Sequence, residues 1–167
     1  NLPKTYSISE LNDAIKNALS DAFPTKVWVH GEVSGYRANS SGHIYFDLVE
    51  KDAEKNSVVA KISCFLPAGL ATFVMRKFQA AGLPGIQDDI EIQVAGEVSY
   101  YSPYGKLSLN IRDIEPAYTL GKMAQAREQI IEGLKRRGLL EKNRQVEIPI
   151  VPLHIGLVTS DGTAAYH

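Results

Sequence analysis

The chain has 167 residues, of which 44% are hydrophobic and 22% charged, a composition typical of a folded globular protein and not of a disordered one. No run of about 18 apolar residues occurs, so we expect no membrane association. A single cysteine, Cys64, excludes an intramolecular disulfide and favours a cytoplasmic location. The formal net charge of -1 argues against a protein that holds nucleic acid by electrostatics alone.

The charge is divided unevenly along the chain. Residues 1–116 contain 11 Lys and Arg against 14 Asp and Glu, whereas residues 117–167 contain 7 against 5. The alternation typical of strands ends at the same place, near Pro116. We therefore predict a first domain over 1–116, a helix and linker over 117–152, and the start of a second domain over 153–167.

The predicted elements begin with a helix over residues 9–22, with Ser9 as its N-cap and with apolar residues at helical spacing. Apolar and polar residues then alternate in three stretches, which predicts strands over 26–36, 43–49 and 58–66. A turn cluster separates the first two strands, and a mostly polar loop separates the second from the third.

A second helix is predicted over residues 68–81, after which the alternation resumes. Two further strands follow, one starting after residue 89 and one over 107–114, joined by a hairpin turn at 102–105. Five strands with a helix between the third and fourth are the order of an OB-fold, a partly open five-stranded Greek-key barrel. The sequence therefore predicts a mainly β chain built on an OB-fold barrel, preceded by an N-terminal helix.

The chain beyond the barrel has a different pattern. Residues 122–137 have the apolar spacing of a helix that ends at Gly138, and residues 141–152 are charged and contain prolines, as linkers do. Residues 154–159 predict a buried strand, followed by a glycine-containing turn. This order is typical of the opening of a parallel α/β unit, so we predict a helical linker into an α/β domain that is cut short.

No pattern in the chain is typical of an active site. The four histidines lie far apart, no metal-ligand spacing occurs, and there is no phosphate-binding loop. Cys64 falls on the predicted core face, so we interpret it as a packed apolar residue and not as a nucleophile. We predict no catalytic residue, no metal and no cofactor in this chain.

Aromatic and cationic residues at outward strand positions and beside two turns predict a nucleic-acid site instead. Aromatic rings that face away from an OB barrel can stack on bases, and nearby cations can contact phosphates. The alternatives are that Trp28 packs on the first helix, that the second helix covers Phe65, and that the cations are ordinary surface charges. The predicted site comprises Trp28, Arg37, His43, Tyr45, Lys61, Phe65, Tyr104, Lys106 and Arg112.

Five ordered segments resemble the large subunit of bacterial exodeoxyribonuclease VII. Each is weakly specific alone, but together they span nearly the whole chain. They are YSISELN at residues 6–12, VWVHGEVS at 27–34, SGHIYFDL at 41–48, YYSPYG at 100–105 and IGLVTS at 155–160.

The resemblance implies an enzyme that degrades single-stranded DNA to short oligonucleotides by phosphodiester hydrolysis, without requiring a divalent metal. It also implies that the N-terminal OB-fold binds the single strand, and that a small subunit binds through regions this chain lacks. The catalytic residues that it implies lie beyond residue 167. We therefore expect this chain alone to bind DNA weakly and to cleave nothing.

Two other functions remain open at this point. The first is a non-enzymatic OB-fold module for protein interaction or oligosaccharide binding, which suits the negative charge of residues 1–116. The second is an RNA-binding module such as an anticodon-binding OB domain. With few cations at the predicted site, nucleic-acid binding should be led by stacking and should depend only weakly on salt.

Overall fold

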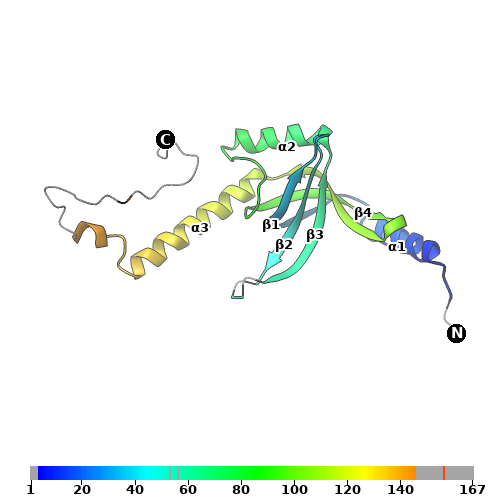
Figure 1. Cartoon of the computed structure of the whole chain (residues 1–167), viewed down its shortest axis with the longest axis horizontal. Coiled ribbons are helices and arrows are strands. Elements are labelled where there is room, and N and C mark those ends of the chain that lie inside the picture. Colours follow the sequence, from blue (N-terminus) through cyan, green and yellow to red (C-terminus); the bar gives the residue numbers. More distant parts are fainter. Residues whose placement is uncertain (1–3, 53, 56, 146–155, 157–167) are drawn as a thin grey trace. The chain divides into compact units, whose positions relative to one another are not determined.

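A computed structural model of the chain describes residues 4–52, 54, 55, 57–145 and 156. The described part is mainly β, with a helix between the third and fourth strands, as predicted (Figure 1). In chain order the elements are α1 (Ile8–Ala22), β1 (Val27–Ala38), β2 (Ile44–Lys51), β3 (Val58–Leu66), α2 (Ala68–Ala80), β4 (Glu91–Tyr101), the 3-10 helix η1 (Ser102–Tyr104), β5 (Lys106–Ile114), α3 (Pro116–Arg136) and the 3-10 helix η2 (Lys142–Gln145).

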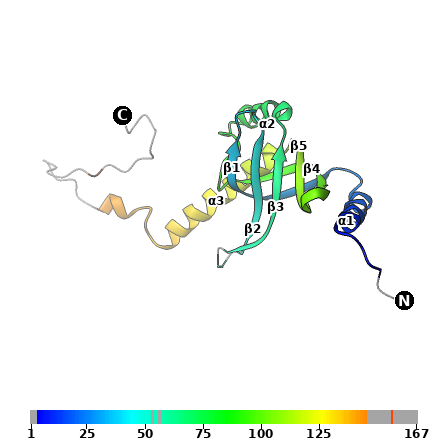
Figure 2. The same cartoon turned by 45° about the vertical axis from the view of Figure 1, so that its right-hand side comes forward.

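The five strands close into a barrel in the order β1-β2-β3-β5-β4, and β4 pairs back onto β1. Neighbouring strands are antiparallel except β3 and β5, which are parallel. Figure 2 shows β2, β3 and β5 side by side on one flank of the barrel. This closed five-stranded arrangement confirms the predicted OB-fold barrel.

Strand β1 bends around the barrel, pairing with β4 through its first half and with β2 through its second. Gly31 lies where the two pairings meet, and a Cβ there would sit 3.0 Å from the carbonyl oxygen of Val49. Gly35, with a φ of +67°, lies inside the register shift between Ser34 and Arg37. A side chain at Gly31 would press on the neighbouring strand, whereas at Gly35 it is the left-handed backbone conformation that favours glycine.

Alternate residues of every strand fill the barrel interior. Helix α2 adds Ala71, Val74 and Phe78 to this core and covers one end of the barrel in both views (Figures 1 and 2). Polar and aromatic side chains are therefore left at the outward positions of the strands. The buried strand residues include Val33, Phe46, Leu48, Cys64, Leu66, Ile92, Val94, Leu109 and Ile111.

Two helices begin earlier than the sequence predicts. The N-cap of α1 is Ser7 and not Ser9: Ser7 Oγ accepts from the Glu10 N–H at 3.2 Å, and Glu10 Oε2 accepts from the Ser7 N–H at 2.7 Å. This reciprocal capping box requires a Glu three residues after the cap, which Ser7 has and Ser9 lacks. Helix α3 begins at Pro116, because proline is well tolerated in a first helical turn.

The chain divides into two compact units, Asn1–Gln125 and Ala126–His167. The predicted divisions after 116 and after 152 stay predictions. The predicted linker over 141–152 is described only as far as Gln145, and the predicted strand over 154–159 lies outside the described residues apart from Gly156. None of the described helices has the length and apolar character needed to cross a membrane.

Candidate nucleic-acid interface

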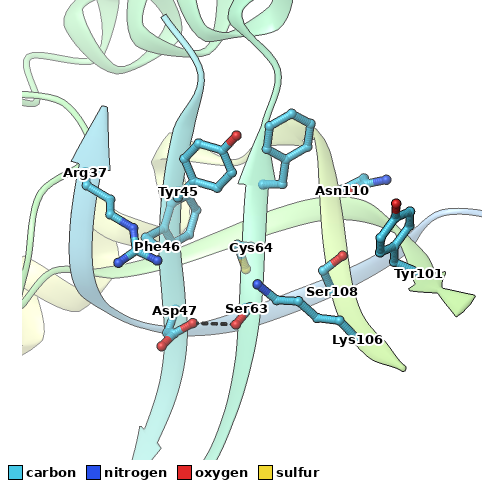
Figure 3. Close-up of a pocket in the computed structure, with 11 residues that line it drawn as sticks. Arg37, Tyr45, Phe46, Asp47, Ser63, Cys64, Tyr101, Lys106, Ser108 and Asn110 are labelled. Atoms are coloured by element: carbon cyan, nitrogen blue, oxygen red, sulfur yellow. Dashed lines mark hydrogen bonds between the residues drawn. The ribbon is translucent and has the colours of Figure 1, made fainter. Parts of the chain in front are cut away.

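A groove of about 590 Å³ runs across the outer face of the barrel over β1, β2, β3 and β5 and reaches the end of β4. Figure 3 shows its side chains. We call it the barrel groove. It is lined by Arg37, Tyr45, Phe46, Asp47, Ser63, Cys64, Phe65, Tyr101, Lys106, Ser108 and Asn110.

Strand register brings one row of these side chains together. Arg37 of β1 pairs with Tyr45 of β2, Tyr45 pairs with Phe65 of β3, and Phe65 pairs with Asn110 of β5. Directly paired residues project from the same face of a sheet, so the four side chains form a row across four strands. The Tyr45 and Phe65 rings lie 5.2 Å apart between centroids, tilted by 40°.

A second aromatic pair lies at the hairpin between β4 and β5. The rings of Tyr101 and Tyr104 are 5.7 Å apart, and Tyr101 lies across the groove from Tyr45 (Figure 3). Tyr101 is 57% exposed and Tyr104 83%, so both rings have free faces. Exposed aromatic faces on an OB barrel are suited to stacking on bases.

The four predicted cations fall into two classes. Arg37 and Lys106 line the groove and form no ion pair with any residue in the described part of the chain. By contrast, the Lys61 ammonium donates to Asp47 Oδ2 at 3.3 Å, and Arg112 Nη2 donates to Glu97 Oε2 at 2.8 Å. The hydrogen bond from Arg112 lowers the pKa of Glu97. Arg37 and Lys106 are thus available to bind phosphate, whereas the charges of Lys61 and Arg112 are partly neutralised by their carboxylate partners.

His43 has a structural role that the sequence did not reveal. Its Nδ1 accepts the backbone N–H of Ala68 at 3.0 Å, at the first residue of α2. Pro67, the N-cap residue, provides no side-chain hydrogen bond, so His43 caps the helix from a neighbouring loop. The same ring lies 5.3 Å from the Phe65 ring, beside the groove.

Trp28 lies elsewhere on the barrel. It pairs with Ala95 of β4, in the half of β1 that is turned away from β2, and it does not line the groove. Its side chain is 49% exposed. Four of the predicted residues line the groove: Arg37, Tyr45, Phe65 and Lys106. Three lie beside it: His43, Lys61 and Tyr104. The structure does not bring the other two, Trp28 and Arg112, to the groove.

Seven lining residues lie outside the predicted site: two of them, Phe46 and Cys64, belong to the core, and the other five are Asp47, Ser63, Tyr101, Ser108 and Asn110. Adjacent residues of a strand point to opposite faces, so only one of Tyr100 and Tyr101 can face outward. The hydroxyl of Tyr100 donates to Asn12 Oδ1 of α1 at 3.0 Å, which leaves Tyr101 facing the groove. A signal for Ser108 and Asn110 was present, because both alternate with the core residues of β5.

Cys64 is a buried core residue and not a reactive nucleophile, as predicted. It is 3% exposed, and burial raises the pKa of its thiol to about 12. The thiol is therefore protonated at neutral pH and is a poor nucleophile. Among the residues that the structure describes, no group of three or more His, Cys, Asp or Glu side chains is placed to hold a metal ion.

The family model described as "OB-fold nucleic acid binding domain" matches residues 6–115, which include all five strands and the whole groove. The chain belongs to this family. Membership makes the barrel a nucleic-acid-binding OB-fold, and it agrees with a surface that combines exposed aromatic rings with the cations Arg37 and Lys106.

The relatives confirm the resemblance that the five sequence segments indicated. The chain is 30% identical to the exodeoxyribonuclease 7 large subunit of Mycoplasma mycoides subsp. mycoides over 99% of this chain and 32% of that protein. It is 32% identical to that of Alkaliphilus oremlandii over 97% of this chain and 36% of that protein. The chain therefore spans about a third of the length of these curated relatives.

One similar solved structure is the mitochondrial single-stranded DNA binding protein Rim1 of S. cerevisiae. The TM-score is 0.40 and the identity 11%, over 56% of this chain and 92% of that one. Values this low carry no inference about what this chain binds.

Proposed function

We propose that this OB-fold domain binds single-stranded DNA in the barrel groove. The observation that carries the proposal is the row Arg37–Tyr45–Phe65–Asn110, in which a cation that pairs with no acidic residue in the described part of the chain lies beside two neighbouring aromatic rings. Such a row suits a single strand because unpaired bases can lie on the rings, whereas bases in a duplex are already stacked on one another.

The roles of the side chains follow from their chemistry. Tyr45 and Phe65 stack on bases, and Tyr101 offers a third ring across the groove. Arg37 and Lys106 contact phosphates at separate positions along the strand. His43, Lys61 and Tyr104 support the groove from its rim. Trp28 and Arg112 remain predicted contacts that only a strand longer than the groove could reach.

We further propose that the intact protein is the large subunit of an exonuclease that hydrolyses single-stranded DNA to short oligonucleotides. The names of the relatives and the five segments that resemble that family support this proposal. In that protein the domain would hold the strand for a catalytic domain, with a small subunit as partner, in the cytoplasm. This chain would supply binding and not cleavage.

Replacing Tyr45 by alanine tests the groove directly. Loss of one stacking ring should weaken binding of a fluorescent single-stranded DNA of about twelve nucleotides by roughly 1–3 kcal/mol. Fluorescence anisotropy titration at fixed salt measures the dissociation constant. Phe73→Ala is the matched control, because Phe73 is a 52% exposed aromatic residue of α2 that does not line the groove. An unchanged dissociation constant for Tyr45→Ala would count against the groove.

The same titration separates the proposal from its alternatives. Duplex DNA of the same sequence should bind more weakly than the single strand. Tighter binding of the matching RNA would reassign the domain to RNA. No measurable binding of any nucleic acid would favour an interaction or oligosaccharide-binding module.

A further inference from the structure

Asp47 is, among the described residues, the one acidic side chain that lines the barrel groove. It projects from β2 two residues after Tyr45, directly opposite Ser63 of β3. Its Oδ1 accepts from the Ser63 hydroxyl at 2.8 Å (Figure 3). Its Oδ2 accepts from the Lys61 ammonium at 3.3 Å. Two side chains of β3 therefore hold the carboxylate, one at each oxygen, and it stays about one-third exposed.

A fixed carboxylate decides how a polyanion can lie in this groove. Phosphate groups are repelled from the floor near Asp47 and attracted to Arg37 on β1 and Lys106 on β5, which flank it on either side (Figure 3). A strand whose phosphates follow those cations turns its bases toward the floor. The base edges then meet Asp47, next to the Tyr45 and Phe65 rings that hold the base planes.

The floor residues differ in what they can recognise. Ser108 and Asn110 each carry both donors and acceptors, so they accept any base edge, whereas the Ser63 hydroxyl already donates its one proton to Asp47. An ionised carboxylate is acceptor-only, and its two oxygens have room for more than the two hydrogen bonds that Asp47 already receives. It can therefore accept from an exocyclic amino group, whereas a carbonyl oxygen at that place meets repulsion.

We propose that Asp47 makes the groove selective for bases with an exocyclic amino group, above all cytosine over thymine or uracil. The inference rests on the proposed binding of a single strand in this groove, and it adds base selection to it. Lys61 and Ser63 are positioning residues, since they hold the carboxylate and touch no base themselves in this arrangement.

The test compares oligo(dC) with oligo(dU), each about twelve nucleotides long, with the whole 167-residue chain. These two pyrimidines differ at the C4 substituent and the N3 proton and have similar ring areas, so differences in stacking are small. Oligo(dC) should bind about tenfold more tightly than oligo(dU), in the range expected for one charge-assisted base contact. Asp47→Asn should reduce the ratio to about one, because the amide can also donate to the uracil O4.

Asp21→Asn is the matched control: it makes the same change of charge on α1, outside the groove, and should keep the tenfold ratio. An oligonucleotide of N4,N4-dimethylcytosine tests the wild-type protein independently of any variant, and it should bind as weakly as oligo(dU). Equal binding of oligo(dC) and oligo(dU), or a ratio that survives in Asp47→Asn, overturns the inference while leaving strand binding intact. Failure of every oligonucleotide to bind overturns the proposed function itself.

Discussion

At the scale of single residues, Gly96 shows how closely two strands approach behind the groove. A Cβ at this position of β4 would lie 2.6 Å from Cγ of Leu109 and 3.0 Å from the carbonyl oxygen of Asn110. Leu109 is fully buried, and Asn110 lines the groove. The ladder between β4 and β5 changes register just before Gly96. The missing side chain therefore lets the core and the groove floor keep their places.

We predict that Gly96→Ala lowers the free energy of unfolding by about 1–3 kcal/mol, because the new methyl group overpacks a filled core. Urea unfolding followed by circular dichroism measures the change. Gly121→Ala is the control, since a Cβ at this position in α3 meets nothing within 4 Å. There alanine should raise the free energy of unfolding by about 0.5–1 kcal/mol. Equal effects at the two positions would contradict the close-approach explanation.

At the scale of elements, one carboxylate of the barrel binds two side chains from the first turns of α3. The Tyr118 hydroxyl donates to Glu91 Oε1 at 2.6 Å, and the Lys122 ammonium lies 3.0 Å from the same oxygen. Nδ1 of His30 on β1 lies 3.8 Å from the same oxygen, and the His30 ring lies 5.5 Å from the Tyr118 ring between centroids, tilted by 37°. Burial alone would raise the pKa of Glu91, but the hydrogen bonds from Tyr118 and Lys122 outweigh it and lower the pKa overall.

This lowered pKa gives a prediction about acid stability. The ionised carboxylate stabilises the fold fully above its unfolded value, near 4.5, and the contribution is lost as pH falls through the lower folded value. The wild-type protein should therefore exceed Glu91→Gln in free energy of unfolding at neutral pH, and the difference should shrink below about pH 4.5. Urea unfolding at a series of pH values checks this.

Tyr118→Phe serves as the intermediate case, because it removes one of the two donors to Glu91 and keeps the aromatic ring. Its pH dependence should lie between those of the wild type and Glu91→Gln. A difference between wild type and Glu91→Gln that stays constant from pH 7 to the acid limit would show that the carboxylate is not stabilised by its ionisation.

At the scale of the whole molecule, the net charge of -1 limits how the domain binds and not whether it does. The excess of acidic residues in 1–116 does not fall in the groove, where Asp47 is outnumbered by Arg37 and Lys106. The groove therefore offers two cations to phosphate, and stacking must supply most of the affinity.

The salt dependence of binding tests this account. Two phosphate contacts on a single strand predict a slope of about -1.4 in a plot of log K against log salt concentration. Replacing Arg37 by methionine should make the slope shallower by about 0.7. Anisotropy titrations at several salt concentrations give both values. A slope steeper than about -4, as six contacts would produce, would mean that cations outside the groove dominate binding.

The sequence predicted most of the fold because strand alternation, helical spacing and turn residues are local properties. Side chains of a strand alternate between its two faces, so the apolar face identifies the core side. Tyr45 and Phe65 were therefore assigned to the outward face without any knowledge of the barrel. The order of elements then limited the topology to an OB-fold. The N-cap of α1 was placed two residues too late, at Ser9, although the spacing from Ser7 to Glu10 is that of a capping box.

Sequence by itself therefore determined which residues face outward, but only the tertiary structure decided which of them meet. Trp28 is as outward as Tyr45, yet it pairs with β4 and lies away from the groove. Lys61 and Arg112 are cations like Arg37, yet each forms an ion pair, Lys61 with Asp47 and Arg112 with Glu97. The parallel pairing of β3 with β5 joins residues far apart in the chain, and such register depends on closure of the whole barrel, which no local pattern encodes.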